Sequence, residues 1–309
     1  RYAQSDQHLE AAIEAASQRR GARTTLHIAA TLAVNALEQG DLPRARRWAA
    51  DALVEDDREG VDQNQRANTL VAAAVVHASA GDLGTALALA ERAVALCNRD
   101  LVRHDVLARW RLAVLQADLG RRDLALRSLR RLASRGDLHG PDLPRVQAAL
   151  LGLGDALPQA EVLERIVALE DVPLRATLLC VAQPGCAPTD VLPLLAMAAS
   201  GARDQGAHGL WLALQGRRAA ALVAAGRHGD AVDVARAAWS AMVGGVVGVE
   251  GTGRVGMTLS AVLRDADPEL ARTVALRTSA WVYQAASTLP PLWRDSYLRR
   301  SVATALPSA

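Results

Sequence analysis

The sequence predicts an all-α protein, built as a right-handed superhelical solenoid of antiparallel helical pairs. Alanine dominates the apolar half of the composition and phenylalanine is absent. Such a core suits close packing of helices over small side chains, whereas strands favour β-branched and aromatic residues. A second observation is a recurring pattern of helix, glycine turn and helix, in which Gly40 and Gly81 are 41 residues apart and Gly81 and Gly120 are 39 apart. The length of 309 residues fits this prediction, because a solenoid grows by adding neighbours to a stack.

The clearest unit covers residues 68–98. Its first helix ends at Gly81, which supplies the left-handed backbone conformation that commonly follows a helix. A second helix then continues through Ala86 and Ala93. Small residues at these two positions, and at Ala74 in the first helix, allow the paired helices to approach closely.

The remaining units are taken in order. Residues 7–19 form the second helix of a partial first unit, and a helix near residues 24–38 opens the next. Pro43 fits the first turn of the helix that follows, where a missing N–H has no partner to lose. Helical runs at 173–182 and 190–200 form a degenerate unit. The predicted hairpin turns lie at Gly40, Gly81, Gly120, Gly154 and Gly226.

These spacings define two regions. Residues 1–289 are interpreted as an array of about seven units, the first of them partial. Residues 290–309 are interpreted as a C-terminal capping helix, because the last unit of an array otherwise exposes the face that each internal unit buries.

Four quintets share the same offsets: Ala seven residues before the turn glycine, Ala five residues after it, and small or apolar residues four and seven further on. This pattern resembles the tetratricopeptide repeat, which implies a superhelical array that binds proteins. The aromatic residue that the family carries in the first helix is missing, and the periods are longer, so a related helical-pair array is the alternative. The quintets are Ala33-Gly40-Ala45-Ala49-Ala52, Ala74-Gly81-Ala86-Ala90-Ala93, Ala113-Gly120-Ala125-Leu129-Leu132 and Ala219-Gly226-Ala231-Ala235-Ala238.

A second resemblance covers roughly the last sixty residues. The segments 262–268 and 289–298 look like the close of the repeat region in large bacterial signalling proteins, either serine/threonine kinases or multidomain signal-transduction ATPases. The resemblance implies that the chain is the sensor or scaffold part of a longer protein, with a catalytic module upstream. The absence of Lys and Phe is typical of a GC-rich bacterial genome.

The composition argues against several functions. The chain contains no Lys, so a Walker-type phosphate loop, a protein kinase site and a pyridoxal site would each lack an essential residue. The net charge is only +2 and the charges are interspersed, so we expect neither nucleic acid nor a membrane surface as a partner. Three cysteines without Cys-x-x-Cys spacing, and the lack of a long apolar run, favour a cytoplasmic protein.

The segment 251–256, Gly-Thr-Gly-Arg-Val-Gly, matches the dinucleotide-binding fingerprint and follows a valine-rich stretch. A Rossmann site requires a parallel sheet around that turn, and the flanking sequence is helical. We therefore interpret the segment as a flexible loop between repeats and expect no bound nucleotide or other cofactor. The seven histidines show no metal-ligand spacing, so no metal site is predicted.

The favoured function is a non-catalytic interaction or sensor module, whose first helices line a concave groove for an extended peptide or a partner helix. Trp110 is the best anchor for a partner, although a Trp packed in the core is the alternative. Two further hypotheses are an intramolecular regulatory arm of an upstream kinase or ATPase, and a stand-alone enzyme on a helical scaffold. The predicted groove residues are Asn68, Val75, Ser79, Trp110, Arg111, Val114 and Asp118.

Overall fold

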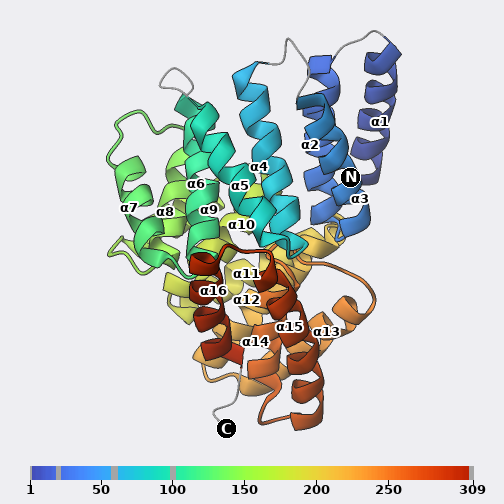
Figure 1. Cartoon of the computed structure of the whole chain (residues 1–309). Coiled ribbons are helices and arrows are strands. Elements are labelled where there is room, and N and C mark those ends of the chain that lie inside the picture. Colours follow the sequence, from blue (N-terminus) through green and yellow to red (C-terminus); the bar gives the residue numbers. More distant parts are fainter. Residues whose placement is uncertain (1, 19–21, 57–61, 98–101, 306–309) are drawn as a thin grey trace.

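A computed structural model describes residues 2–18, 22–56, 62–97 and 102–305, and these residues form an all-helical array without strands. Consecutive helices pack against each other in pairs. The N-terminal row, α1 to α9, occupies the upper part of Figure 1. Its helices are α1 (Tyr2–Gln18), α2 (Ala22–Glu38), α3 (Leu42–Asp56), α4 (Gln63–Ser79), α5 (Leu83–Leu96), α6 (Val102–Asp118), α7 (Arg122–Ala133), α8 (Asp142–Gly152) and α9 (Gln159–Val167).

The C-terminal row lies beneath the first row in the same view (Figure 1). The degenerate unit predicted at 173–182 and 190–200 is present as its first two α-helices. The row consists of α10 (Val172–Ala182), the short 3-10 helix η1 (Gln183–Gly185), α11 (Pro188–Asp204), α12 (His208–Ala224), α13 (His228–Val243), α14 (Thr252–Leu263), α15 (Pro268–Ser287) and α16 (Pro291–Ala305).

The predicted hairpin turns are confirmed. All five turn glycines have positive φ, between 71° and 85°. In the α4–α5 turn, the N–H of Asp82 donates to the carbonyl of His77 at 2.9 Å, which satisfies one of the free carbonyls at the end of α4. The Asp82 carboxylate then accepts from the N–H of Thr85 and caps α5. In this turn a glycine followed by an aspartate therefore ends one helix and starts the next.

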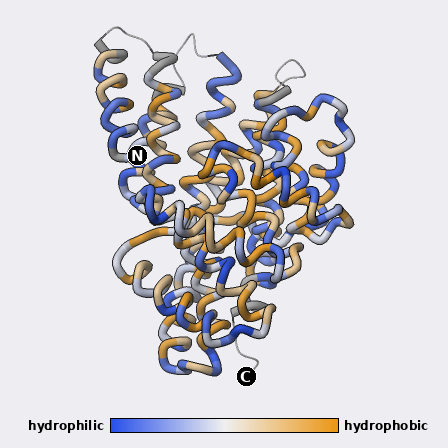
Figure 2. Tube along the Cα trace, turned by 180° about the vertical axis from the view of Figure 1, so that it is seen from behind, coloured by the Kyte–Doolittle hydropathy of each residue, from blue (hydrophilic) through white to orange (hydrophobic). Residues whose placement is uncertain are grey.

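The C-terminal row folds back against the turns of the N-terminal row. The hydroxyl of Ser296 on α16 donates to the carbonyl of Leu119 at 2.7 Å, beside the Gly120 turn. The Gly81 turn faces the ring of Trp281 on α15, and Gly40 lies against Gly209 at the start of α12. Hydrophobic segments gather in the middle of the molecule, where the two rows meet (Figure 2).

Helix α16, within the predicted capping segment 290–309, packs on α14, α15 and the Gly120 turn. Its inner face buries Tyr297, while Leu292 on the outer face is 68% exposed. Residues 306–309 of that segment lie outside the described residues. Among the residues that are described, each helix is too short or too polar to cross a lipid bilayer.

The glycines of the dinucleotide-like segment have packing roles instead. A Cβ atom at Gly253 would lie 2.3 Å from the Trp281 ring, and one at Gly256 would lie 2.2 Å from the Thr278 hydroxyl. Both glycines thus allow α14 and α15 to pack closely. The interpretation of 251–256 as a flexible loop is wrong for most of the segment, because α14 begins at Thr252. No strand precedes it in the described part of the chain.

We predict that Gly209→Ala destabilises the protein by about 3 kcal/mol, as overpacking does at sites that cannot relax. The added methyl group would lie 2.3 Å from the carbonyl oxygen of Leu37 and 2.7 Å from that of Val247, so three backbone segments would have to move. The control is Gly201→Ala within α11, where the added methyl group meets no atom within 4 Å. It should stabilise the helix by about 0.5–1 kcal/mol. Urea denaturation of both variants measures the difference, and equal effects would contradict the close approach of the rows.

Candidate functional site: an inner cavity between the two rows

A cavity of about 700 Å³ lies where the two rows meet. Most of its wall comes from the even-numbered helices α2 to α14, which are the first helices of the consecutive pairs. Apolar side chains of these helices alternate with a small number of charged ones. Cavities of a few hundred to a thousand Å³ with this mixture are typical of ligand-binding sites.

Five of the seven predicted groove residues line this cavity. Val75 and Ser79 come from α4, whereas Arg111, Val114 and Asp118 come from α6. The three α6 residues are three and four positions apart, so they share one face of the helix.

The other two predicted groove residues lie elsewhere. Trp110 is fully buried and belongs to the core that contains Leu129 and Val146, so its predicted role as an exposed anchor is wrong. A step of one residue turns a helix by about 100°, so Trp110 leaves α6 in a different direction from Arg111 and enters the core. Asn68 is outside the cavity, where its Oδ1 lies 3.1 Å from Nδ1 of His104 on α6.

Residues 244–251, here called the strap, connect α13 to α14 and pass along the cavity wall. The strap N–H groups of Val247 and Val249 donate to the carbonyls of Gly40 and Gly209, each at 3.3 Å. The Ser79 hydroxyl donates to the carbonyl of Val249 at 2.9 Å. The Gly40 turn, α12 and α4 therefore hold this non-helical segment through its main chain.

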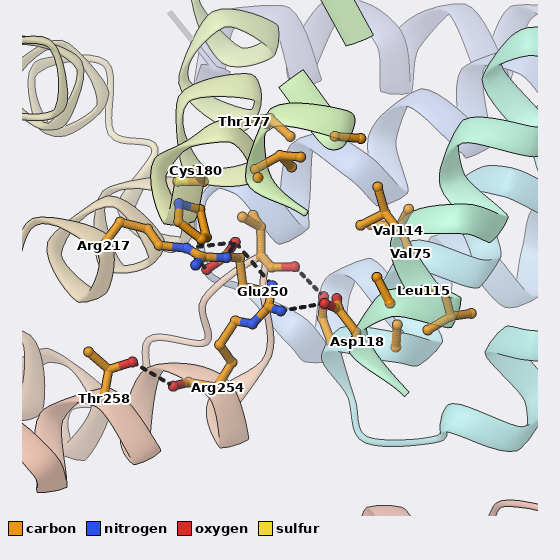
Figure 3. A pocket seen from close by; sticks show the side chains of 18 of the residues that line it. Val75, Val114, Leu115, Asp118, Thr177, Cys180, Arg217, Glu250, Arg254 and Thr258 are labelled. Carbon is orange, nitrogen blue, oxygen red and sulfur yellow. Dashed lines mark hydrogen bonds and ion pairs between the residues drawn. The ribbon is translucent and has the colours of Figure 1, made fainter. Parts of the chain in front are cut away.

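The strap ends in a buried ion pair (Figure 3). Nη2 and Nε of Arg217 on α12 donate to the two carboxylate oxygens of Glu250 at 2.6 and 3.0 Å, in a bidentate arrangement. The two side chains are only 13% and 12% exposed. Burial alone would lower the pKa of Arg217, but the Glu250 carboxylate outweighs it, and the pKa is raised. Arg217 is therefore held in its charged form.

The charge network continues from Glu250 to the C-terminal end of α6 (Figure 3). Nη1 of Arg254 lies 3.6 Å from Glu250, and its Nη2 donates to the carboxylate of Asp118. Asp118 also lies 3.6 Å from Nη1 of Arg300 on α16. Cations and carboxylates thus alternate along this end of the cavity, and each of these charges has an opposite neighbour.

A different arrangement surrounds Arg111 on α6 and Glu38 on α2. Burial raises the pKa of Glu38 to about 7, although the Tyr2 hydroxyl donates to its carboxylate at 2.8 Å. Burial and the neighbouring Arg145 lower the pKa of Arg111, and Glu38 only partly offsets this. Arg111 and Glu38 face the same cavity without forming an ion pair with each other.

We predict that Glu38→Gln flattens the dependence of stability on pH. The folded state binds the Glu38 proton more tightly than the unfolded state, because the pKa rises from its ordinary value of 4.5 to about 7. Ionisation of Glu38 does not affect the free energy of unfolding below pH 4.5. This free energy falls as the pH rises from 4.5 to about 7, and above pH 7 it is lower by a constant amount. That amount is about 3 kcal/mol at 1.36 kcal/mol per pKa unit. In urea denaturation at pH 8 the variant should be more stable than the wild type, and at pH 4 equal to it. Parallel pH profiles would contradict this placement of Glu38.

Two buried or half-buried thiols offer little nucleophilic chemistry. Burial raises the pKa of Cys180, which lines the cavity, and also raises the pKa of Cys186, to about 11. Both sulfurs therefore remain protonated at neutral pH, and the thiolate is the reactive form. Within the described part of the chain, His, Cys, Asp and Glu side chains form no cluster that could hold a metal ion.

Sequence reasoning missed Arg217, Glu250 and Arg254. Arg217 had a local signal, since it and Arg218 interrupt the largely apolar helical sequence of residues 209–224. A charged residue in such a position requires a buried partner or a cavity. Glu250 and Arg254 are four positions apart at the start of a helix, but their partners come from α12 and α6, which no local pattern indicates.

Comparison of the sequence with protein-family models and with curated proteins finds no match.

Proposed function

We propose that this protein is a non-catalytic interaction or sensor module, which binds a peptide segment of a partner protein in the inner cavity. The observation that carries the proposal is the origin of the cavity wall. The first helices of consecutive pairs supply most of it, and the inner face of a helical array is where such proteins bind their ligands.

The strap supports a peptide as the ligand. Two main-chain N–H groups of the strap donate to carbonyls of the surrounding chain, one strap carbonyl accepts from a hydroxyl, and the strap carboxylate of Glu250 accepts from an arginine. These are the interactions through which proteins bind extended peptides. The same wall chemistry suits a ligand segment that combines aliphatic side chains with an acidic group.

We also propose that the helices form a tetratricopeptide-like superhelix and that the module is part of a larger protein. The four quintets and the helical pairs support a tetratricopeptide-like array, and the resemblance of the C-terminal segments supports a role within a larger bacterial signalling or regulatory protein. In that context the module acts in the cytoplasm.

Selection from a library of random dodecapeptides on the immobilised chain tests the proposal. We expect enrichment of peptides that carry at least two aliphatic residues near an Asp, a Glu or a free C-terminus. Enrichment no greater than on the bare support would overturn the proposed function. Enrichment of basic peptides would contradict the assignment of the cavity as the binding site.

A further inference from the structure

The charged residues of the cavity are unequally partnered. Arg217, Arg254 and Arg300 each have a carboxylate within ion-pair distance. Arg111 lines the same cavity, but no carboxylate in the described part of the chain lies within 4.0 Å of its guanidinium group. Its Nε atom is buried and has no hydrogen-bond partner among the described residues.

The surroundings hold Arg111 in place without neutralising it. Its guanidinium carbon lies 4.4 Å from the centre of the Trp110 ring, a cation–π contact that orients the planar group. The neighbouring cation Arg145 forms an ion pair with Asp142 at 2.7 Å, and its positive charge repels that of Arg111. A buried charge without a partner is costly, so the free protein maintains an unfavourable group at this position.

Glu38 does not take the role of partner. Its Oε2 accepts from the Tyr2 hydroxyl, and burial favours the protonated form of its carboxyl group. The groups that act on Glu38 are Tyr2 on α1, Asp171 before α10 and Arg111 on α6. When Glu38 is protonated, Arg111 is the unneutralised charge at this end of the cavity.

We propose that Arg111 is an anion-binding subsite, which takes a carboxylate of the ligand through its planar guanidinium fork. Arg suits this role because it binds carboxylates bidentately and is only weakly hydrated. Val75 and Val114 line the cavity as well and provide apolar surface for the aliphatic part of the ligand. The inference rests on the proposed function for the source of the carboxylate, which is a peptide side chain or C-terminus.

The subsite has its own pH dependence. Ionisation of Glu38 places a second negative charge beside the bound carboxylate, so affinity should fall as the pH rises through about 7. Glu38→Gln should remove this dependence. The Arg217–Glu250 pair is already neutralised and should not contribute to it.

The experiment uses the full chain labelled with ¹⁵N-tryptophan, titrated with N-acetyl-valyl-glutamate and, as the uncharged control, with its diamide. The reporter is the indole N–H of Trp110, assigned with Trp110→Phe. We expect the dicarboxylate to shift this signal at pH 6, and the diamide to bind at least tenfold more weakly. Arg111→Gln should abolish the difference, whereas Arg277→Gln should keep it. Arg277 is a matched control, since it lies 5.6 Å from the centre of the Trp239 ring but outside the cavity.

Arg111→Gln should also melt at a temperature no lower than the wild type, because the substitution removes an unpaired charge. A large loss of stability would mean that Arg111 is structural and would overturn the subsite. Equal shifts with the dicarboxylate and the diamide would overturn it too.

If the dicarboxylate binds as expected while no dodecapeptide is selected, the subsite stands and the peptide-binding function fails. If peptides bind without regard to charge or to Arg111, the function stands and the subsite fails.

Discussion

Glu250→Ala should destabilise the protein by about 3–5 kcal/mol, which is the usual cost of removing one partner from a buried ion pair. Arg217 would remain in place with its side chain 13% exposed and with its bidentate acceptor gone. The strap would also lose the interaction that fixes its end. Chemical denaturation at pH 7 measures the loss.

Two controls separate the buried charge from other effects. Asp230→Ala removes a carboxylate from the exposed Arg227–Asp230 pair and should cost less than about 1 kcal/mol. Arg217→Met combined with Glu250→Leu replaces both charges by apolar groups and should recover most of the loss. A Glu250→Ala variant as stable as Asp230→Ala would show that the network does not hold the strap.

Truncation of the chain after Leu289 should lower stability by about 4 kcal/mol or more. Helix α16 buries Tyr297 and Ser296 and partly buries Trp293, and each large apolar side chain contributes about 1.5–3 kcal/mol when it leaves water. Thermal unfolding of the truncated chain should show a lower melting temperature or aggregation.

Point variants locate the effect of the truncation. Tyr297→Ala should cost about 3 kcal/mol, as aromatic truncations in a core do, and Leu292→Ala, at an exposed position, should cost almost nothing. A truncated chain that is equally stable but loses a binding partner would mean that α16 is an interaction site and does not protect the core.

The sequence was sufficient to predict the local parts of the fold. The glycine turns are encoded within a few residues, because a glycine follows the end of each first helix, and at Gly40 and Gly81 the aspartate that comes next caps the second helix. The spacing of the Gly154 and Gly226 turns, together with the helical runs between them, likewise predicted the degenerate pair α10 and α11.

No pattern in the sequence predicted that the second row folds back against the first. This arrangement depends on contacts such as that between Leu119 and Ser296, which are 177 residues apart and leave no pattern in either segment. The same limit applies to the site. Helical spacing placed Arg111, Val114 and Asp118 on one face, but it assigned the neighbouring Trp110 to the groove although its side chain packs in the core. Glu250 was missed because its role depends on Arg217 from another helix.

Filling the inner cavity is the sharpest test of whether a peptide binds there. Val114→Trp places a large side chain in the space of about 700 Å³, whereas Val54→Trp places the same side chain at a position that is 66% exposed on α3. Calorimetry with the best selected dodecapeptide should show at least a 100-fold loss of affinity for Val114→Trp, and no change for Val54→Trp. Unchanged affinity in a folded Val114→Trp variant would contradict the claim, because the peptide would then bind elsewhere.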